Sequence, residues 1–200
     1  MSTSRAGWLI IVGIVGATAT AATQATWLPA PVRQGLVEQL NERMVAIGPG
    51  TPKDPAGLAQ AMGKVVTAVA QRVDTWAERG VVDRAPTFPR LTVPAAGNRH
   101  LDAMNRYQIC NMVLFPQFES GSDLQARRTA AFGLTAVTIA VVRLREPYVA
   151  AGGNDQLIEA FLTGPPMAKV LDAVLATPDL LAHVESRCEP VIGDLLATAF

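Results

Sequence analysis

The densest group of polar side chains in the sequence is the segment NRHLDAMNRY at residues 98–107. It places His100 two residues from the carboxylate of Asp102, and such a pair is used in general acid–base catalysis. On a helix, however, Asp102 and Arg106 are four residues apart and can pair on one face. We therefore expect a solvated helix start whose charges pair with one another. A hydrolase or transferase that uses His100 with Asp102 or Asp123 is the less favoured alternative.

Acidic residues near the carboxyl terminus are the second place where chemistry could occur. Glu185 and Glu189 lie four residues apart and share a helix face, as one half of a dinuclear metal site would require. Such a site also needs Glu-x-x-His sequences on other helices, and the chain contains none. His183 and Glu185 are two residues apart, so they point in different directions on a helix. The sequence therefore predicts a solvated acidic edge and no metal ligands.

Motifs of known catalytic and cofactor sites are missing from the sequence. It contains no CxxC, CxxCH, HExxH, P-loop or GxSxG pattern, and two histidines cannot form a histidine-rich metal site. Seventeen basic residues balance seventeen acidic ones, whereas nucleic-acid-binding proteins carry a concentrated basic excess. We therefore expect no cofactor, no nucleic-acid partner and no enzymatic activity.

The amino terminus has the order of features of a secretory signal. One arginine in MSTSR is followed by an apolar run at residues 6–16 and by the small-residue stretch ATATAATQA. Residues 17–19 and 19–21 both satisfy the small-x-small rule for cleavage. Cleavage there would release a soluble periplasmic protein.

The alternative, which we favour, is a retained membrane anchor. Residues 7–28 carry no charge and would span about 33 Å as a helix, enough for a bilayer core. Trp8 and Trp27 lie near the two ends, and tryptophan is enriched at membrane interfaces. This interpretation predicts a single pass of the inner membrane with residues 29–200 in the periplasm. The main apolar anchor residues are Trp8, Leu9, Ile10, Ile11, Val12, Ile14, Val15, Trp27 and Leu28.

Export changes the interpretation of the two cysteines, Cys110 and Cys188. In an oxidising compartment they are expected to form a disulfide. The bond would close a loop of nearly eighty residues and contribute about 4 kcal/mol in the chain-entropy model. The alternative is two reduced, buried thiols that behave as small hydrophobic groups.

The spacing of apolar residues predicts an all-α domain, an irregular bundle of about six to seven helices. Residues 129–142 are apolar on every face and predict its central helix, which at about 21 Å is too short to span a membrane. The residues expected to begin helices are Pro31, Pro55, Asn98, Ser122 or Asp123, Asn154 and Pro178, and those expected to end or kink helices are Gly48, Gly80, Pro116, Gly164 and Pro190.

The segment from residue 80 to 97 contains three prolines, so it cannot continue a helix or a central strand. We expect an ordered, extended loop that wraps the bundle, and such loops on rigid scaffolds are common contact sites. The residues expected to pack it and to contribute to an interaction surface are Val81, Val82, Phe88, Leu91 and Val93.

These features predict a membrane-anchored, periplasmic accessory or structural subunit of an envelope protein complex. Its expected partners are the membrane, through the amino-terminal helix, and other envelope proteins. The alternative is a soluble periplasmic protein that binds an apolar ligand between its helices, which the large share of aliphatic side chains would permit.

Overall fold

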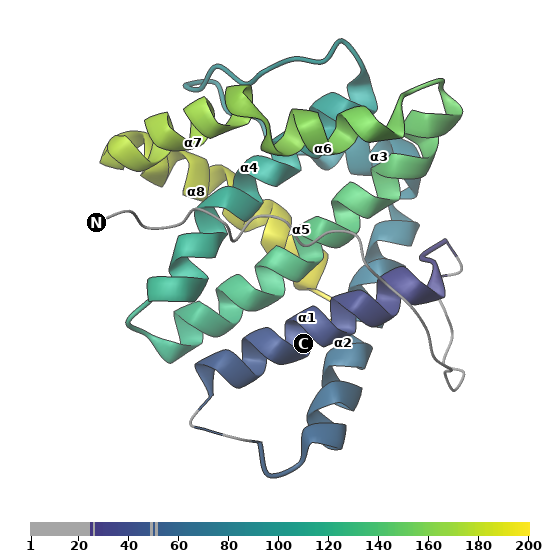
Figure 1. The fold of residues 1–200 in the computed structure, drawn as a ribbon, viewed down its shortest axis with the longest axis vertical. Coiled ribbons are helices and arrows are strands. Elements are labelled where there is room, and N and C mark those ends of the chain that lie inside the picture. The colour runs from purple at the N-terminus through teal and green to yellow at the C-terminus, as the bar shows by residue number, and fades with distance from the viewer. Residues whose placement is uncertain (1–24, 26, 49, 51) are drawn as a thin grey trace.

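The computed structural model describes residues 25, 27–48, 50 and 52–200, and within them the chain forms helices and no strands (Figure 1). The predicted all-α class is confirmed. Only Trp76 separates α2 from α3, so counting these two as one bent helix brings the described total to seven. The helices are α1 (Ala30–Ile47), α2 (Pro55–Thr75), α3 (Ala77–Arg84), α4 (Arg99–Ser120), α5 (Leu124–Ala150), α6 (Asp155–Thr163), α7 (Pro165–Ala176) and α8 (Pro178–Leu196).

Helices α4 and α5 form the antiparallel pair at the centre of the bundle, joined by the short link at residues 121–123. The middle of α5 is buried on nearly all sides, as its uniformly apolar sequence predicts. Gly133 lets neighbouring helices approach closely, because a Cβ atom there would lie 3.0 Å from Leu114 Cδ1 and 3.2 Å from Ile192 Cγ2. The close packing of α4, α5 and α8 thus depends on the missing side chain.

The remaining helices surround this central pair. Helix α1 packs against α2 and α5, and α8 packs against α4, α5 and α7. Helices α6 and α7 lie across the upper part of the view in Figure 1, next to the extended segment that follows α3. One hydrophobic core connects all of these elements.

Two prolines that were expected to end or kink helices lie inside continuous ones. Helix α4 continues through Pro116 to Ser120, and α8 continues through Pro190 to Leu196. Both prolines are exposed. On the solvent side, water can bond the carbonyl that each proline leaves without a partner, and the helix can curve away from the ring. The prediction that α4 ends at Pro116 is therefore wrong.

The predicted helix end at Gly80 is also wrong, because the break occurs at Trp76 and Ala77. Ala77 has a φ angle of +53°, a left-handed conformation that is costly for a residue other than glycine. The break lets the Trp76 side chain turn into the core, where it is 7% exposed. Gly80 lies within α3, so Val81 and Val82 belong to this helix and the extended segment begins at Ala85.

The structure describes only the end of the predicted anchor. Ala25 and Leu28 are buried in the helical body, at 7% and 4% exposure, and Trp27 packs against it. These residues therefore belong to the body, whereas the expected anchor residues from Trp8 to Val15 lie outside the described residues. No helix in the described part of the chain combines the length and apolar character needed to cross a membrane.

Candidate functional site

The polar cluster at the start of α4 holds the extended segment 85–98, called the wrap below, in place. Asn98 caps α4, since its Oδ1 accepts hydrogen bonds from the backbone N–H groups of His100 (2.9 Å) and Leu101 (3.3 Å). One turn later, Asp102 Oδ1 accepts a 2.7 Å bond from the backbone N–H of Ala96. The carboxylate that was a candidate for acid–base chemistry thus binds the backbone of the wrap.

Three further side chains of α4 bind backbone carbonyl oxygens before and within the wrap. Asn105 is fully buried, and its Nδ2 donates to Pro94 O at 2.7 Å. Arg106 Nη1 donates to Ala85 O at 3.3 Å, and the Tyr107 hydroxyl donates to Val81 O at 2.9 Å. Together with Asp102, these side chains form a clamp, which is the name used below for this set of four.

The expected solvated helix start is only partly correct, because Arg99 is exposed whereas two members of the clamp lie in the protein interior. Asn105 and Tyr107 have no exposed surface, and His100 is 5% exposed. Burial raises the pKa of Tyr107 well above its usual value, because the phenolate would be desolvated. The clamp therefore holds the backbone of the wrap in place, because the polar side chains of α4 supply hydrogen-bond partners for its N–H and C=O groups.

The alternative acid–base pair of His100 and Asp123 is contradicted by the fold. Asp123 caps α5, where Oδ1 accepts from Gln125 N (3.1 Å) and Oδ2 from Ala126 N (3.0 Å). His100 is at the first turn of α4, and Asp123 follows its last turn, so about 33 Å of helix separates them. These two side chains cannot act on one substrate.

The five residues expected to pack the extended segment all pack against the core, although Val81 and Val82 do so from α3. Val81 is fully buried and Phe88 is 5% exposed, while Val82, Leu91 and Val93 are half-buried against the core. Since Val81 and Phe88 face the interior, a partner protein would contact the exposed side chains of the wrap instead. The exposed wrap residues on either side of Phe88 and Leu91 are Thr87, Pro89, Arg90 and Thr92.

A groove runs between the wrap and α7. It has a volume of about 480 Å³ and combines Leu91 and Pro94 of the wrap with Pro165, Val170 and other residues of α7. Its lining is mainly apolar, and Lys169 is its one charged residue. The groove could hold a small ligand with an apolar body, and a negative charge on that ligand would suit the lysine.

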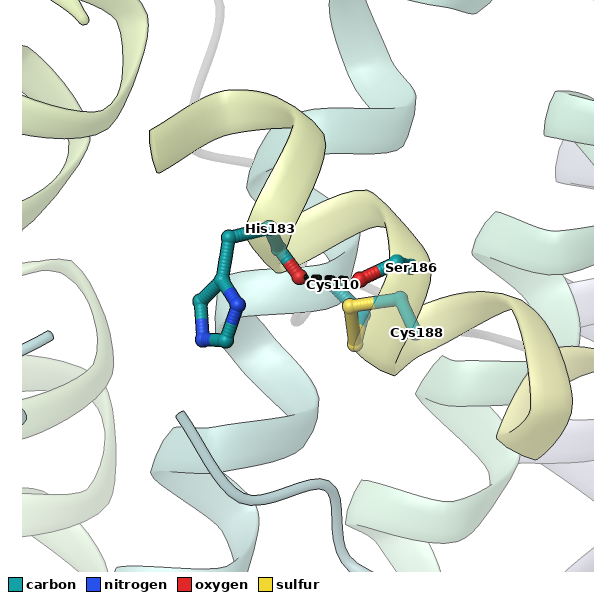
Figure 2. The surroundings of a disulfide bond; sticks show 4 residues. All are labelled: Cys110, His183, Ser186 and Cys188. Carbon is teal, nitrogen blue, oxygen red and sulfur yellow. Dashed lines mark hydrogen bonds between the residues drawn. A yellow bond between two sulfur atoms is a disulfide. The ribbon is translucent and has the colours of Figure 1, made fainter. Parts of the chain in front are cut away.

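The predicted disulfide joins Cys110 of α4 to Cys188 of α8 (Figure 2). Both cysteines are buried, at 0% and 2% exposure. His183 and Ser186 lie on the turns of α8 that precede Cys188, and Ser186 Oγ donates to His183 O at 2.8 Å. The bond ties the last helix to the centre of the bundle.

The expected acidic edge near the carboxyl terminus is only partly solvated. Glu185 Oε1 accepts a 2.5 Å hydrogen bond from Gln117 Nε2 of α4, whereas Glu189 is exposed.

Partial desolvation and the positive charges of Arg90 and Arg187 lower the pKa of His183. In the described part of the chain, no group of three or more His, Cys, Asp or Glu side chains is placed to hold a metal ion.

One polar cluster was missed by the sequence analysis. Asp194 of α8 forms ion pairs with Arg72 of α2 and Arg84 of α3. Both guanidinium groups lie over the Trp76 ring, at 5.9 Å and 4.9 Å from its centroid. The spacing of Arg72 and Trp76 indicates a shared helix face, but nothing in the sequence indicates a partner more than one hundred residues away.

Compared with protein-family models, curated proteins and solved structures, the chain shows no significant match to any of them.

Proposed function

We propose that this protein is an exported helical accessory or structural subunit of an envelope protein complex, held at the inner membrane by its amino-terminal segment. The observation that carries the proposal is the buried bond between Cys110 and Cys188. Structural disulfides persist in oxidising compartments and are rare in the cytosol. The secretory order of features at residues 1–25 supports the same compartment.

The subunit role is supported by the use that the chain makes of its polar residues. The clamp on α4 fixes the wrap, so the exposed side chains of this loop, among them Thr87, Pro89, Arg90 and Thr92, are presented on a rigid scaffold. Such loops are common contact sites. Partner binding through Pro89, Arg90 and Thr92 would need no change in the bundle.

The compartment is tested by the intact mass of the native chain, recovered from whole cells without reductant and measured again after reduction. Retention of the anchor predicts the full-length mass of 21.2 kDa. Cleavage after the small-residue stretch would remove about 2 kDa. A gain of about two mass units on reduction shows the disulfide in the cell. A full-length chain without that gain would contradict export.

The subunit role is tested by migration on a native gel after extraction in mild detergent. The chain should migrate in a complex well above its own 21.2 kDa. Arg90→Glu should release it, whereas the control Lys64→Glu, an exposed charge reversal on α2 away from the wrap, should not. If the wild-type chain migrates alone, the subunit proposal is wrong.

The groove beside α7 favours a second candidate function, a soluble periplasmic protein that binds an apolar ligand. Its volume of about 480 Å³ is within the range of small-molecule sites. Native mass spectrometry of the purified protein should then show a bound molecule. Ala173→Trp, which fills the groove from α7, should abolish that adduct, whereas Ala176→Trp, at another exposed position at the end of the same helix, should not.

A further inference from the structure

A second pocket of about 480 Å³ lies where the described chain enters the bundle. Trp27 and Pro29 form one side of it together with Val32 of α1, and Val142 and Val149 of α5 form the other. Both the start of α1 and the carboxyl end of α5 lie at the right-hand side of Figure 1. Val149 is 42% exposed, so the rim of the pocket presents aliphatic surface to its surroundings.

The first described residues are already part of the helical body. Ala25 and Leu28 are buried, and Trp27 Nε1 donates to Ala70 O of α2 at 3.3 Å. The described chain is therefore part of the body from residue 25 onward. Residues 7–24 remain for a membrane span and would measure about 27 Å as a helix, close to the ~30 Å thickness of a hydrocarbon core.

The two arginines that line the pocket are paired within the chain. Arg143 lies 3.9 Å from Asp74 and 5.1 Å from the centroid of the Trp27 ring. Arg145 Nε donates to Asp155 Oδ1 at 2.7 Å. Because these cations already have acidic partners, the rim has no free excess of positive charge with which to attract anionic lipid.

We propose that the face around this pocket rests on the headgroup layer of the membrane. This inference depends on the proposed function, since the anchor holds the face there: a span that ends at residue 24 leaves the neighbouring residues nowhere else to lie. An indole ring, long arginine side chains and exposed aliphatic groups suit the interface between lipid and water. Because both arginines of the pocket are paired, this face has no preference for anionic lipid, and we expect it to rest on a zwitterionic bilayer surface.

The test uses the full-length chain reconstituted in phosphatidylcholine vesicles. The two native cysteines form the disulfide, so Val149→Cys provides one unique thiol for a nitrobenzoxadiazole probe. The matched control is Leu175→Cys, 45% exposed, at the end of α7 on the opposite side of the bundle. Flotation first reports whether the chain is held by the vesicles, and a lipid-attached nitroxide then quenches any probe close to the bilayer.

The probe at residue 149 should be quenched severalfold more than the probe at residue 175. Adding phosphatidylglycerol should leave that ratio unchanged. Equal quenching at both positions in floating vesicles would overturn the inference while leaving the anchor intact. A ratio that rises steeply with phosphatidylglycerol would overturn the zwitterionic assignment. A chain that does not float would overturn both the anchor and the inference.

Discussion

Replacing Tyr107 by phenylalanine tests whether the clamp stabilises the fold. The change removes one hydroxyl from a fully buried side chain and leaves the ring in place. That hydroxyl is the partner of Val81 O, because the Ala85 N–H at the end of α3 donates to Val82 O instead. A buried carbonyl left without a partner costs about 1–3 kcal/mol, so we expect the free energy of unfolding to fall by about 2 kcal/mol.

The chain contains its own control, since it has two tyrosines. The Tyr148 hydroxyl lies 3.5 Å from Asn154 O, at the limit of a hydrogen bond. Tyr148→Phe should therefore lower the free energy of unfolding by less than about 1 kcal/mol. Urea unfolding followed by circular dichroism measures both variants. Equal losses, or a loss below about 0.5 kcal/mol for Tyr107→Phe, would refute the reasoning.

The alkaline side of the stability profile provides an independent readout. Burial raises the pKa of Tyr107 in the folded chain, so the unfolded chain ionises first, near its ordinary value of 10.0. The corresponding stability is complete below pH 10 and falls as the pH rises above it. The Tyr107→Phe variant lacks this component. The free energy of unfolding of the wild type should therefore fall towards that of the variant as the pH increases. Parallel curves across that range would contradict the burial of the hydroxyl.

Three further predictions follow from the bundle. Cys110→Ala combined with Cys188→Ala should lower the free energy of unfolding by about 4 kcal/mol, because the bond closes a separation of 78 residues, and unfolding under matched redox conditions checks this. Gly133→Ala should lower the free energy of unfolding by about 1–3 kcal/mol, since its Cβ would crowd a leucine of α4 at 3.0 Å. Gly193→Ala, whose Cβ would have no neighbouring atom within 4 Å, should be neutral or stabilising by up to ~1 kcal/mol. Thermal melts that rank the two variants the other way would contradict the packing. The hydrogen-bonded guanidinium of Arg145 lowers the pKa of Asp155, so the stability that this carboxylate contributes is present above its usual pKa of 3.8 and is lost as the pH falls through the lowered pKa. The small difference in the free energy of unfolding between wild type and Asp155→Asn should shrink in that range. A difference that persists in strong acid would contradict the ion pair.

Helix starts were predictable from short stretches of sequence. Asp54, Asn98, Asp123 and Asn154 each accept a hydrogen bond from a backbone N–H in the first turn of the helix that follows. The capping residue lies within three positions of its partners, so the signal is local. The same locality explains why the apolar central helix was identified at 129–142 before any packing was known.

Helix ends and polar sites were predicted less well, because both depend on distant parts of the chain. Gly80 is a typical stop residue, yet α3 continues through it, since the break that buries Trp76 occurs four residues earlier. Asp102 looked like a catalytic or surface carboxylate, but the wrap brings Ala96 N within 2.7 Å of it. Neither outcome is encoded in the residue types alone.

The sequence by itself determined the helical class, most of the helix starts, the proline-rich segment that contains the wrap and a single possible disulfide pairing. Periodicity, capping chemistry and the presence of two cysteines all act over short distances or leave one choice. Only the tertiary structure decided that the clamp belongs to the wrap, that Asp194 pairs with Arg72, and that Trp27 belongs to the body. Those contacts join residues that are far apart in the chain, and water could bind the same polar groups. Only the folded core therefore determines which partner each group has.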